Sequence, residues 1–425
     1  MIAHSFDFIR RPDQPVTDAI ADEDFRAIVN QVRIFVRERV VPREIEIMRL
    51  DAVPDDLRRM AADMGLFGYA IPVEWGGLGL SIVHDVELAM ELGYTTLALR
   101  SMFGTNNGIA GQVLVNFGSP EQKAQWLERI ASGEVVASFA LTEPGAGSNP
   151  GSLRTRARRD GDSFVINGGK RFITNAPLAG LFVVFARTDS PGGDGADGAD
   201  GADGADGAGG AGPIAVFLVP ADSEGITVGP RDHKMGQEGA WTADVTFTDV
   251  RVPASAMVGE SEEVGYRAAM MSLARGRIHI AALAVGTAQR ALDESVAYAA
   301  SATQGGQAIG GFQLVQAMLA DQYTGVLAGR SLVREAARLW DTNTDRRIAP
   351  SAAKLFCTEM AGQVADRAVQ IHGGTGYMRE VAVERIYRDV RLLRLYEGTS
   401  EIQRLIIGGG LTRSTAAVRP SATTR

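Results

Sequence analysis

Through the first third of the chain, hydrophobic and polar positions alternate with the period of an α-helix. From Asp24 onward, apolar residues recur every three or four places with charges between them, at Phe25, Ile28, Val29, Val32, Phe35 and Val36. Similar patterns predict helices over 54–65, 81–94 and 119–131, the last with Ser119 as its cap and Pro120 in its first turn. The pattern therefore predicts an α-helical domain over residues 1–133.

The rhythm changes to that of β-strands around Val135. The run VVASFAL is short and apolar, and LRTRARRDGDSFVINGGKRFIT alternates in twos, broken by Asp160-Gly161 and Asn167-Gly168, dipeptides typical of hairpin turns. LFVVFAR, IAVFLVP and ADVTFTDVRVP are further predicted strands. Residues 134–253 are thus expected to form a small central β domain, a barrel or a sandwich.

After Pro253 the helical spacing returns in three long segments, 262–301, 312–341 and 350–371. Their apolar stripes suit an antiparallel helical bundle, which we expect over 254–415 with a short tail over 416–425. The predicted fold class is therefore α+β and mainly α, in the order helices, strands, helices.

A low-complexity segment, GGDGADGADGADGADGAGGAG, occupies residues 192–212 between two predicted strands. Glycine recurs at every third place through most of it, but proline is absent, which does not support a collagen helix. Its aspartates match neither an EF-hand nor the nonapeptide calcium repeat. We interpret the segment as a disordered, solvated surface loop.

Composition narrows the classes of function. A chain of 425 residues, 45% of them hydrophobic, is long enough for two or three packed subdomains. The net charge of -8 gives no electrostatic reason to bind nucleic acid or an anionic membrane. No secretion signal and no membrane span is predicted, and Cys357, in an apolar helical pattern, is expected to be a buried, inert thiol. We expect a soluble cytoplasmic protein.

Several familiar signatures are incomplete in this chain. In EPGAGSNPG the glycines miss the dinucleotide spacing, and the segment follows a predicted strand in an antiparallel context. GGKRF lacks the Ser or Thr of a phosphate-binding P-loop, and EGTSEI lacks the second glycine of a nucleophile elbow. We also expect no metal site, because the five histidines form no ligand spacing: His4, His84, His233, His279 and His372.

Two predicted strands end in polar segments that could hold a planar ring. LTEPGAGSN, residues 141–149, offers hydroxyls and approachable backbone N–H groups together. Taken alone, this segment fits better with an ordinary tight loop. KRFITNA, residues 170–176, favours a ring-binding site, because it ends a neighbouring strand with an aromatic, Phe172, and a hydroxyl, Thr174.

The segment LYEGTSEIQ places an acid, Glu397, directly before a chain turn. Ser400 and Gln403 have the spacing of a capping box, which predicts a helix beginning at 401. A carboxylate just before this turn could project into a cavity, where loss of solvent would raise its pKa and make it a base near neutral pH. Taken alone, the segment fits better with a solvated acid near a helix N-terminus.

Four motifs together, LTEPGAGS, NGGKRFITNA, QIHGGTGY and LYEGTSEIQR, resemble the acyl-CoA dehydrogenase family of flavoproteins over about residues 20–411. The resemblance implies an N-terminal helical domain, a central β domain and a C-terminal four-helix bundle. It also implies a homotetramer or homodimer, with FAD between the β domain and the bundle and part of its site supplied by a neighbouring subunit.

The resemblance assigns roles residue by residue. One group would line FAD from this chain: Phe139, Leu141, Thr142, Gly147, Ser148, Phe172, Ile173, Thr174, Thr399 and Glu401. A second group would contact the partner subunit's FAD: Gln313, Gln370, Ile371, His372, Gly373 and Gly374. The substrate would meet Ser148, Arg277, Tyr396 and Gly398.

By the same resemblance, Glu397 is the catalytic base that removes the α-proton of an acyl-CoA, while the β-hydrogen passes as hydride to flavin N5. The products would be a trans-2-enoyl-CoA and reduced FAD, which electron-transfer flavoprotein would reoxidise. The backbone N–H of Glu397 and a flavin hydroxyl would stabilise the enolate-like charge. Some family members carry the base on the long helix near Arg277, where this chain has Gly276.

The chain departs from the family pattern at several places. Ala302 and Gly305 replace a usual arginine and phenylalanine, which predicts weaker FAD retention through a lost charge-assisted contact. Ala274 and Asn149 each replace a frequent aspartate, and Phe172 replaces a tryptophan in many relatives. Two alternatives therefore stay open: the same desaturation on an acyl-carrier-protein thioester, or a non-catalytic member. A flavin monooxygenase is less favoured because it would not need a base at 397.

Overall fold

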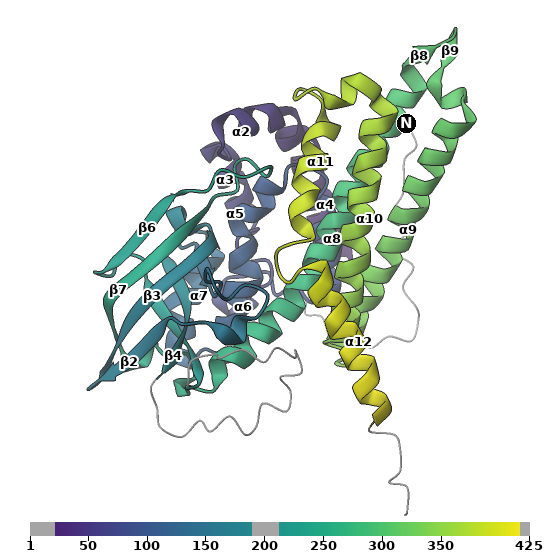
Figure 1. Cartoon of the computed structure of the whole chain (residues 1–425). Helices are drawn as coiled ribbons and strands as arrows, with labels where there is room; N and C mark the ends of the chain where they lie inside the picture. Colours follow the sequence, from purple (N-terminus) through teal and green to yellow (C-terminus); the bar gives the residue numbers. More distant parts are fainter. Residues whose placement is uncertain (1–21, 189–211, 417–425) are drawn as a thin grey trace, which may run out of the picture.

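The structure, a computed structural model, describes residues 22–188 and 212–416. Of the predicted Gly-Ala-Asp loop at 192–212 only residue 212 is described, and of the tail at 416–425 only residue 416. The rest of both predictions lies outside the described residues. The fold class is confirmed: helices come first, a β-sheet domain follows, and a helical bundle closes the described chain (Figure 1).

Seven α-helices form the first part of the described chain: α1 (Asp22–Ile34), α2 (Glu44–Leu50), α3 (Asp55–Asp63), α4 (Ile82–Leu92), α5 (Leu97–Asn107), α6 (Ile109–Phe117) and α7 (Pro120–Ala131). The helices predicted over 54–65, 81–94 and 119–131 are confirmed as α3, α4 and α7. Ser119 caps α7 by accepting a hydrogen bond from the backbone of Gln122. Sequence reasoning missed α5, which is buried along its whole length and whose polar residues are buried as well, so it shows no alternation of apolar and solvent-facing positions.

The described part of the central domain contains seven strands: β1 (Ala137–Ala140), β2 (Arg156–Asp160), β3 (Ser163–Thr174), β4 (Leu181–Thr188), β5 (Ile214–Pro220), β6 (Ile226–Arg231) and β7 (Thr242–Pro253). They pair in the order β1-β4-β2-β3-β7-β6, and β5 also pairs with β4. The antiparallel context expected around the first strand is wrong, because β1 pairs with β4 in parallel.

Of the two predicted hairpin turns, Asp160-Gly161 is confirmed between β2 and β3. Asn167-Gly168 is wrong as a turn, because both residues lie inside β3, where Asn167 pairs with Arg156 on β2 and Gly168 with Phe247 on β7. Gly168 marks a register shift there, and a Cβ at this position would lie 2.4 Å from Oγ1 of Thr155. The dipeptide therefore forms a β-bulge where two strands approach closely, and it does not reverse the direction of the chain.

The sheet folds over on itself around an aromatic interior. Phe182 on β4 packs edge-on against Phe247 on β7, and Phe164 on β3 packs against Phe217 on β5. Because neither pair comes from hydrogen-bonded neighbour strands, the β4–β5 layer must face the β3–β7 layer. Phe139 and Phe185 point to the opposite side of β1 and β4, into a core shared with α6, α7 and the start of α8.

The bundle contains α8 (Val264–Ser301), α9 (Gln313–Asp341), α10 (Ile348–His372) and α11 (Ala382–Leu393), followed by α12 (Ser400–Ala416). A two-stranded hairpin, β8 (Thr303–Gln304) and β9 (Gln307–Ala308), joins α8 to α9 at the end of the bundle far from α12 (Figure 1). The three long helices predicted by pattern are confirmed as α8, α9 and α10. Cys357 is fully buried on α10, as expected.

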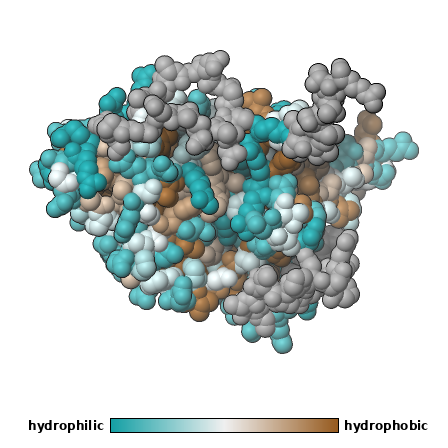
Figure 2. Space-filling view, turned by 90° about the horizontal axis from the view of Figure 1, so that it is seen from below, coloured by the Kyte–Doolittle hydropathy of each residue, from teal (hydrophilic) through white to brown (hydrophobic). Residues whose placement is uncertain are grey.

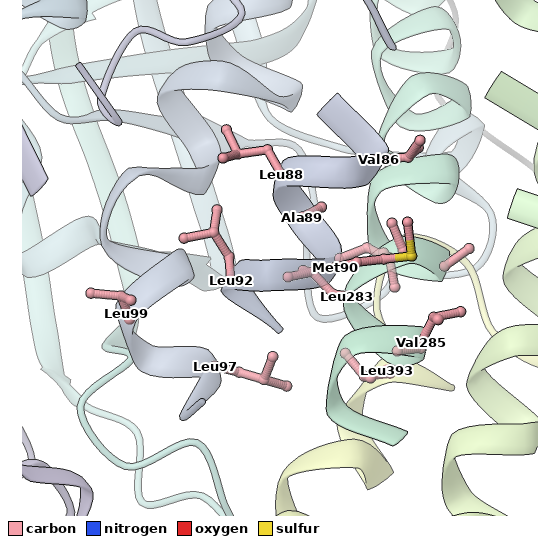
Figure 3. Close-up of a cluster of buried hydrophobic side chains, with 14 of the residues drawn as sticks. Val86, Leu88, Ala89, Met90, Leu92, Leu97, Leu99, Leu283, Val285 and Leu393 are labelled. Carbon is pink, nitrogen blue, oxygen red and sulfur yellow. The ribbon is translucent and has the colours of Figure 1, made fainter. Parts of the chain in front are cut away.

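Helix α8 joins the bundle to the N-terminal helices. Met90 on α4 points towards Leu283 and Val285 on α8 (Figure 3). The backbones come unusually close here, because a Cβ at Gly286 would lie 2.1 Å from the carbonyl oxygen of Met90. Among the described helices, α8 alone is long and apolar enough to cross a membrane, but 83% of its most apolar window is buried inside the protein. It is the central core helix.

Apolar side chains also reach the surface. Figure 2 shows hydrophobic residues among hydrophilic ones on the lower face of the molecule. On the bundle, the most exposed large apolar residues include Leu314 on α9 at 81% and Tyr377 after α10 at 80%. These two lie near the ends of α8, α9 and α10 that surround the β8–β9 hairpin.

The loop between β6 and β7 docks onto α11 through a buried acid. Asp389 is 3% exposed, and its Oδ1 accepts a hydrogen bond of 2.5 Å from the backbone N–H of Gln237. Burial raises the pKa of Asp389 to about 7, although the nearby Arg385 cation opposes the rise. The folded protein therefore holds the proton of Asp389 more tightly than the unfolded chain does.

This linkage predicts a pH-dependent contribution to stability. An acid whose pKa is raised on folding stabilises the fold at low pH, and that contribution falls as pH rises from about 4 through about 7. We expect Asp389→Asn, which keeps the acceptor for Gln237, to gain on the order of 2 kcal/mol relative to wild type between pH 5 and pH 8. Urea unfolding at both pH values measures this difference, and parallel pH profiles would contradict it.

Candidate functional site

The acid Glu397 lies in the turn between α11 and α12. Glu397 and Gly398 both have left-handed backbone conformations, with φ of 53° and 90°. Such a conformation is strained for a residue with a long side chain, and it persists only where surrounding contacts enforce it. The turn changes the direction of the chain after α11 and places the carboxylate against α8. The two groups are so close that a Cβ at Gly276 would lie 2.2 Å from Glu397 Oε2.

Two side chains hold this turn by its carbonyl groups. Lys354 on α10 is fully buried, and its Nζ donates a hydrogen bond of 2.5 Å to the carbonyl oxygen of Gly398. Gln403 on α12 donates from Nε2 to the same oxygen at 2.9 Å and to the carbonyl oxygen of Glu397 at 3.3 Å. The strained backbone is therefore held by side chains from α10 and α12.

The capping box predicted for Ser400 and Gln403 is wrong. Helix α12 begins at Ser400, one residue earlier than expected, and Thr399 Oγ1 accepts from the backbone N–H of Ile402 at 3.4 Å. Ser400 Oγ instead donates to Glu359 on α10 at 2.5 Å. The side chain of Gln403 turns back to the carbonyl oxygens of Glu397 and Gly398, so neither side chain caps the helix.

The carboxylate of Glu397 lacks a fixed partner. The residue as a whole is partly exposed, but its Oε2 atom is buried and has no hydrogen bond within the described residues. Burial raises the pKa of Glu397 above its ordinary value. Three nearby cations offset part of that rise: Arg100, Lys354 and Arg277. An unpartnered carboxylate with a raised pKa is a stronger proton acceptor than a solvated one.

The predicted ring-binding strand ends do lie together. The backbone N–H of Arg171 donates to the carbonyl oxygen of Thr142 at 2.8 Å, and Ser138 Oγ donates to the carbonyl oxygen of Thr174 at 2.9 Å. Asn175, next along the chain, donates from its side chain to the carbonyl oxygen of Ser101 on α5 at 2.8 Å. This end of the β domain is therefore tied to α5.

A buried ion pair fixes the LTEPGAGSN segment beneath its surface. Lys170 Nζ lies 2.7 Å from Glu143 Oε1 and also donates to the carbonyl oxygen of Leu141 at 3.1 Å. The same carboxylate accepts from Thr155 Oγ1 at 2.6 Å and from the backbone N–H of Arg154 at 2.6 Å. Burial lowers the pKa of Lys170 to about 8 while Glu143 opposes the change. These hydrogen bonds all lie on the inner side of the LTEPGAGSN segment, so they leave its outer face free to bind a ligand.

The outward face of these segments fits a flavin. Phe172 is 57% exposed with a left-handed backbone, φ 57°, and a Cβ at Gly147 would meet no atom within 4 Å. Thr142 and Thr174 are partly exposed, and Ser148 is exposed. An exposed aromatic beside hydroxyls and an open glycine backbone suits a planar, polar ring.

Three other residues predicted to contact the flavin lie differently. Phe139, Leu141 and Ile173 have buried side chains, so only their backbone is available to a cofactor. After the turn, Glu401 is exposed at the start of α12, and Thr399 is partly buried.

The residues predicted to reach a partner's cofactor form a separate group. Gln313, at the start of α9, is exposed, as are Gln370, Gly373 and Gly374 at the end of α10. Ile371 and His372 are buried, and His372 stacks on Tyr298 of α8 with ring centres 4.2 Å apart. This group surrounds the β8–β9 end of the bundle, whereas Glu397 precedes α12 near the other end (Figure 1).

Arg277 and the neighbours of Glu397 complete the predicted substrate contacts. Arg277 is buried on α8 next to Gly276, and its Nη1 lies 3.4 Å from Ser351 Oγ. Burial raises the pKa of Tyr396. Glu397 and Arg277 are thus brought together, as the resemblance implies.

Sequence reasoning missed Arg100 and Lys354, two cations whose charges reach Glu397. Both stand alone in apolar runs, LALRSMF and SAAKLF, that form buried helices. A single charge inside such a run is the signal that could have found them, because fully buried Lys and Arg are rare without a specific partner.

The contact between Gly276 and Glu397 gives a direct test. We expect Gly276→Ala to displace the carboxylate, because the new methyl group would meet Oε2 at 2.2 Å. A displacement of about 1 Å at a reacting group can cost roughly 10²-fold in rate. The measurement is kcat/KM together with FAD content, and Gly408→Ala, at an exposed position on α12 with open space, is the matched control. Full activity of Gly276→Ala would contradict this geometry.

Comparison with known proteins agrees with this geometry. Three family models match, the acyl-CoA dehydrogenase N-terminal domain over residues 22–134, the middle domain over 138–250 and the C-terminal domain over 263–412. The chain is 36% identical to the short-chain specific acyl-CoA dehydrogenase of Homo sapiens, covering 92% of this chain and 91% of that protein. It is also 36% identical to the caffeyl-CoA reductase-Etf complex subunit CarC of Acetobacterium woodii, covering 87% and 92%.

Among solved structures, the acyl-CoA dehydrogenase complexed with FAD from Bacillus anthracis superimposes with a TM-score of 0.84 at 30% identity, covering 96% of this chain and 69% of that one. The matches extend over all three structural regions and include the segments around Glu397 and Phe172. The chain belongs to the acyl-CoA dehydrogenase family of FAD-dependent oxidoreductases.

Proposed function

We propose that this protein oxidises the α,β-carbon bond of an acyl-CoA thioester, with Glu397 as the base that removes the α-proton. The observation that carries the proposal is the buried, unpartnered Oε2 of Glu397, held by a strained turn against Gly276 of α8. The similarity to the human short-chain specific acyl-CoA dehydrogenase supports the substrate class.

The first task of the site is to make the α-proton acidic. Negative charge develops on the thioester oxygen as the proton leaves, so a donor must be aimed at that oxygen. The backbone N–H of Glu397 is available, because no group in the described chain accepts from it. The left-handed turn fixed by Lys354 and Gln403 holds this N–H without any movement during the reaction.

The second task is to accept the proton. Burial raises the pKa of Glu397, so its ionised form is a stronger base than a solvated acid, while the nearby cations keep that form accessible. FAD, when bound, supplies the acceptor for the hydride that leaves the β-carbon. Thr142, Phe172 and Thr174 would hold its ring, and the product is a trans-2-enoyl thioester.

The proposed partners follow from the same resemblance. Reduced flavin needs an electron acceptor, and the similarity to an Etf complex subunit supports electron-transfer flavoprotein in that role. The group at Gln313 and 370–374 lies at the β8–β9 end of the bundle, away from Glu397. This position supports a second copy of the chain, whose cofactor the group would contact. The exposed Leu314 and Tyr377 lie beside this group and offer apolar surface for such an assembly.

Removing the carboxylate tests the base directly. We expect Glu397→Gln to retain FAD but to lose rapid anaerobic flavin bleaching by acyl thioesters, with a fall of 10³-fold or more, on the order of the larger general-base effects. In the wild type, the bleaching rate should rise with pH, with a midpoint above 4.5 because burial raises the pKa of Glu397. Acyl-CoA and acyl-carrier thioesters are compared to identify the carrier, and rapid bleaching by the variant would refute the assignment.

The departure at Ala302 gives a second test. Ala302 ends α8 beside the β8–β9 hairpin, where the family pattern has an arginine. We expect Ala302→Arg to tighten FAD binding by about ten-fold, through a charge-assisted hydrogen bond to the cofactor's phosphates. Ser301→Arg, one residue away on an exposed position, is the control for charge alone. Equal FAD affinity in all three proteins, measured by equilibrium titration of the apoprotein, would count against the idea.

A further inference from the structure

The loop between β6 and β7, residues 232–241, presses a buried glutamine against α11. Gln237 is 2% exposed and has a left-handed backbone, φ 55°, which is strained for a residue with a long side chain. Its backbone N–H donates to Asp389 Oδ1 at 2.5 Å, and its Nε2 donates to the carbonyl oxygen of Asp389 at 3.1 Å. The fit is close, because a Cβ at Gly236 would lie 2.8 Å from the same Oδ1. Two hydrogen bonds to α11 therefore enforce the strained conformation.

The side chain of Gln237 also reaches Tyr396, the residue directly before Glu397. Burial raises the pKa of the Tyr396 hydroxyl, and a side-chain hydrogen bond with Gln237 opposes that rise. The amide must donate in this bond, because a donor stabilises the ionised hydroxyl. A side-chain amide has two hydrogens, so Gln237 can donate to Asp389 and to Tyr396 together. Gln237 thus joins α11 to the residue that precedes the acid.

The other end of the loop is tied to the N-terminal helices and to β3. The backbone N–H of Gly239 donates to Asp51 Oδ1 at 2.7 Å, and Trp241 Nε1 donates to the carbonyl oxygen of Asp51 at 2.5 Å. The carbonyl oxygen of Trp241 accepts from the backbone N–H of Asn175 at 2.8 Å, directly after Thr174. The loop therefore connects the strand end that suits a flavin to the turn that carries Glu397.

The peptide unit between Tyr396 and Glu397 carries the N–H proposed to bind the thioester oxygen. A peptide unit is planar, so the placement of Tyr396 sets the direction of this N–H. Lys354 and Gln403 hold the carbonyl groups of Glu397 and Gly398, which belong to the next two peptide units. Within the described residues, no group donates to the carbonyl oxygen of Tyr396. The direction of the N–H therefore depends on how the side chain of Tyr396 is held.

We propose that Gln237 is a positioning residue, which holds Tyr396 so that the backbone N–H of Glu397 points at the thioester oxygen. The inference rests on the proposed function. Gln237 makes no contact with the thioester in this role and acts through Tyr396. A misdirected donor would stabilise the charge that develops on the thioester oxygen less well. It would leave the binding of the uncharged thioester nearly unchanged, so the rate and the affinity should respond differently.

The enolate step can be isolated with the 3-thia analogue of the acyl-CoA that bleaches the wild-type flavin fastest. Sulfur replaces the β-carbon, so the base can remove the α-proton but no β-hydride can leave. The enolate then accumulates beside oxidised flavin and is measured by its long-wavelength absorbance. We expect the Gln237→Met holoprotein to lower the equilibrium constant for enolate formation by about ten-fold, less than the loss of a complete donor. In the Glu397→Gln background, where no enolate forms, the Kd of the analogue should change by no more than about three-fold.

Tyr396→Phe tests the other end of the same contact and leaves the loop intact. We expect it to lower enolate formation as Gln237→Met does. The double variant should be no worse than the more affected single variant, because both changes remove one contact. Additive losses would mean that Gln237 does not act through Tyr396. If Gln237→Met does not fold, Tyr396→Phe alone decides the question, and unchanged enolate formation there would overturn the proposal.

The matched control is Gln322→Met. Gln322 is a fully buried glutamine on α9, and its Nε2 donates to Ser295 Oγ at 3.2 Å and to the carbonyl oxygen of Val364 at 3.0 Å. We expect this variant to lower the thermal midpoint as Gln237→Met does and to keep the wild-type equilibrium constant for enolate formation. An equal loss of enolate in the two variants would reflect general destabilisation and would rule out a positioning role.

The outcomes separate this inference from the proposed function. Wild-type enolate formation in Gln237→Met would leave Gln237 as a structural contact, while ordinary acyl thioesters would still bleach the wild-type flavin. If no acyl thioester bleaches the wild-type flavin, the proposed function itself is wrong.

Discussion

The hydrogen bond from Lys354 to the carbonyl oxygen of Gly398 is the contact on which the site depends. It fixes a turn with two successive left-handed residues, which would otherwise relax because Glu397 has a side chain. Burial lowers the pKa of Lys354 to about 8, while the Glu397 carboxylate opposes that change. One lysine thus sets both the position of the acid and part of its electrostatic environment.

The β domain uses a second buried lysine in the same way. Lys170 binds the carbonyl oxygen of Leu141 and pairs with Glu143, so the segment that follows β1 is held from inside. In both places a lysine satisfies backbone carbonyls of an irregular turn that no sheet or helix can satisfy. The turns are rigid because their polar groups are paired internally, and their outer faces remain available for ligands.

The sequence predicted the helices with one polar face, the order of the three regions and the acid in its turn. It failed where local signals conflict with long-range contacts. Asn167-Gly168 has the composition of a turn but lies in a strand, because Gly168 must pass close to Thr155.

Other failures have the same origin. Ser400 and Gln403 have the spacing of a capping box, but their side chains bind Glu359 and the carbonyl oxygen of Gly398 instead. The contact of Arg100 with His279 joins residues 179 positions apart, a pairing that no local pattern encodes. Local rules therefore located the elements and the acid, and tertiary contacts determined the surroundings of the acid.

The cations around Glu397 suit the proposed reaction because the proton transfer moves a negative charge from one group to another and creates no new charge. Before transfer the negative charge lies on the carboxylate, and afterwards it lies on the thioester oxygen near the N–H of the same residue. Arg100, Lys354 and Arg277 act on the Glu397 carboxylate, and in the proposed reaction the thioester oxygen would lie in the same field of positive charge. Charges and dipoles that are already oriented for both positions would leave little reorganisation for the proposed enolate step. In the proposed reaction, the strained backbone of Glu397 would be the structural cost of having the base and the backbone donor in one residue.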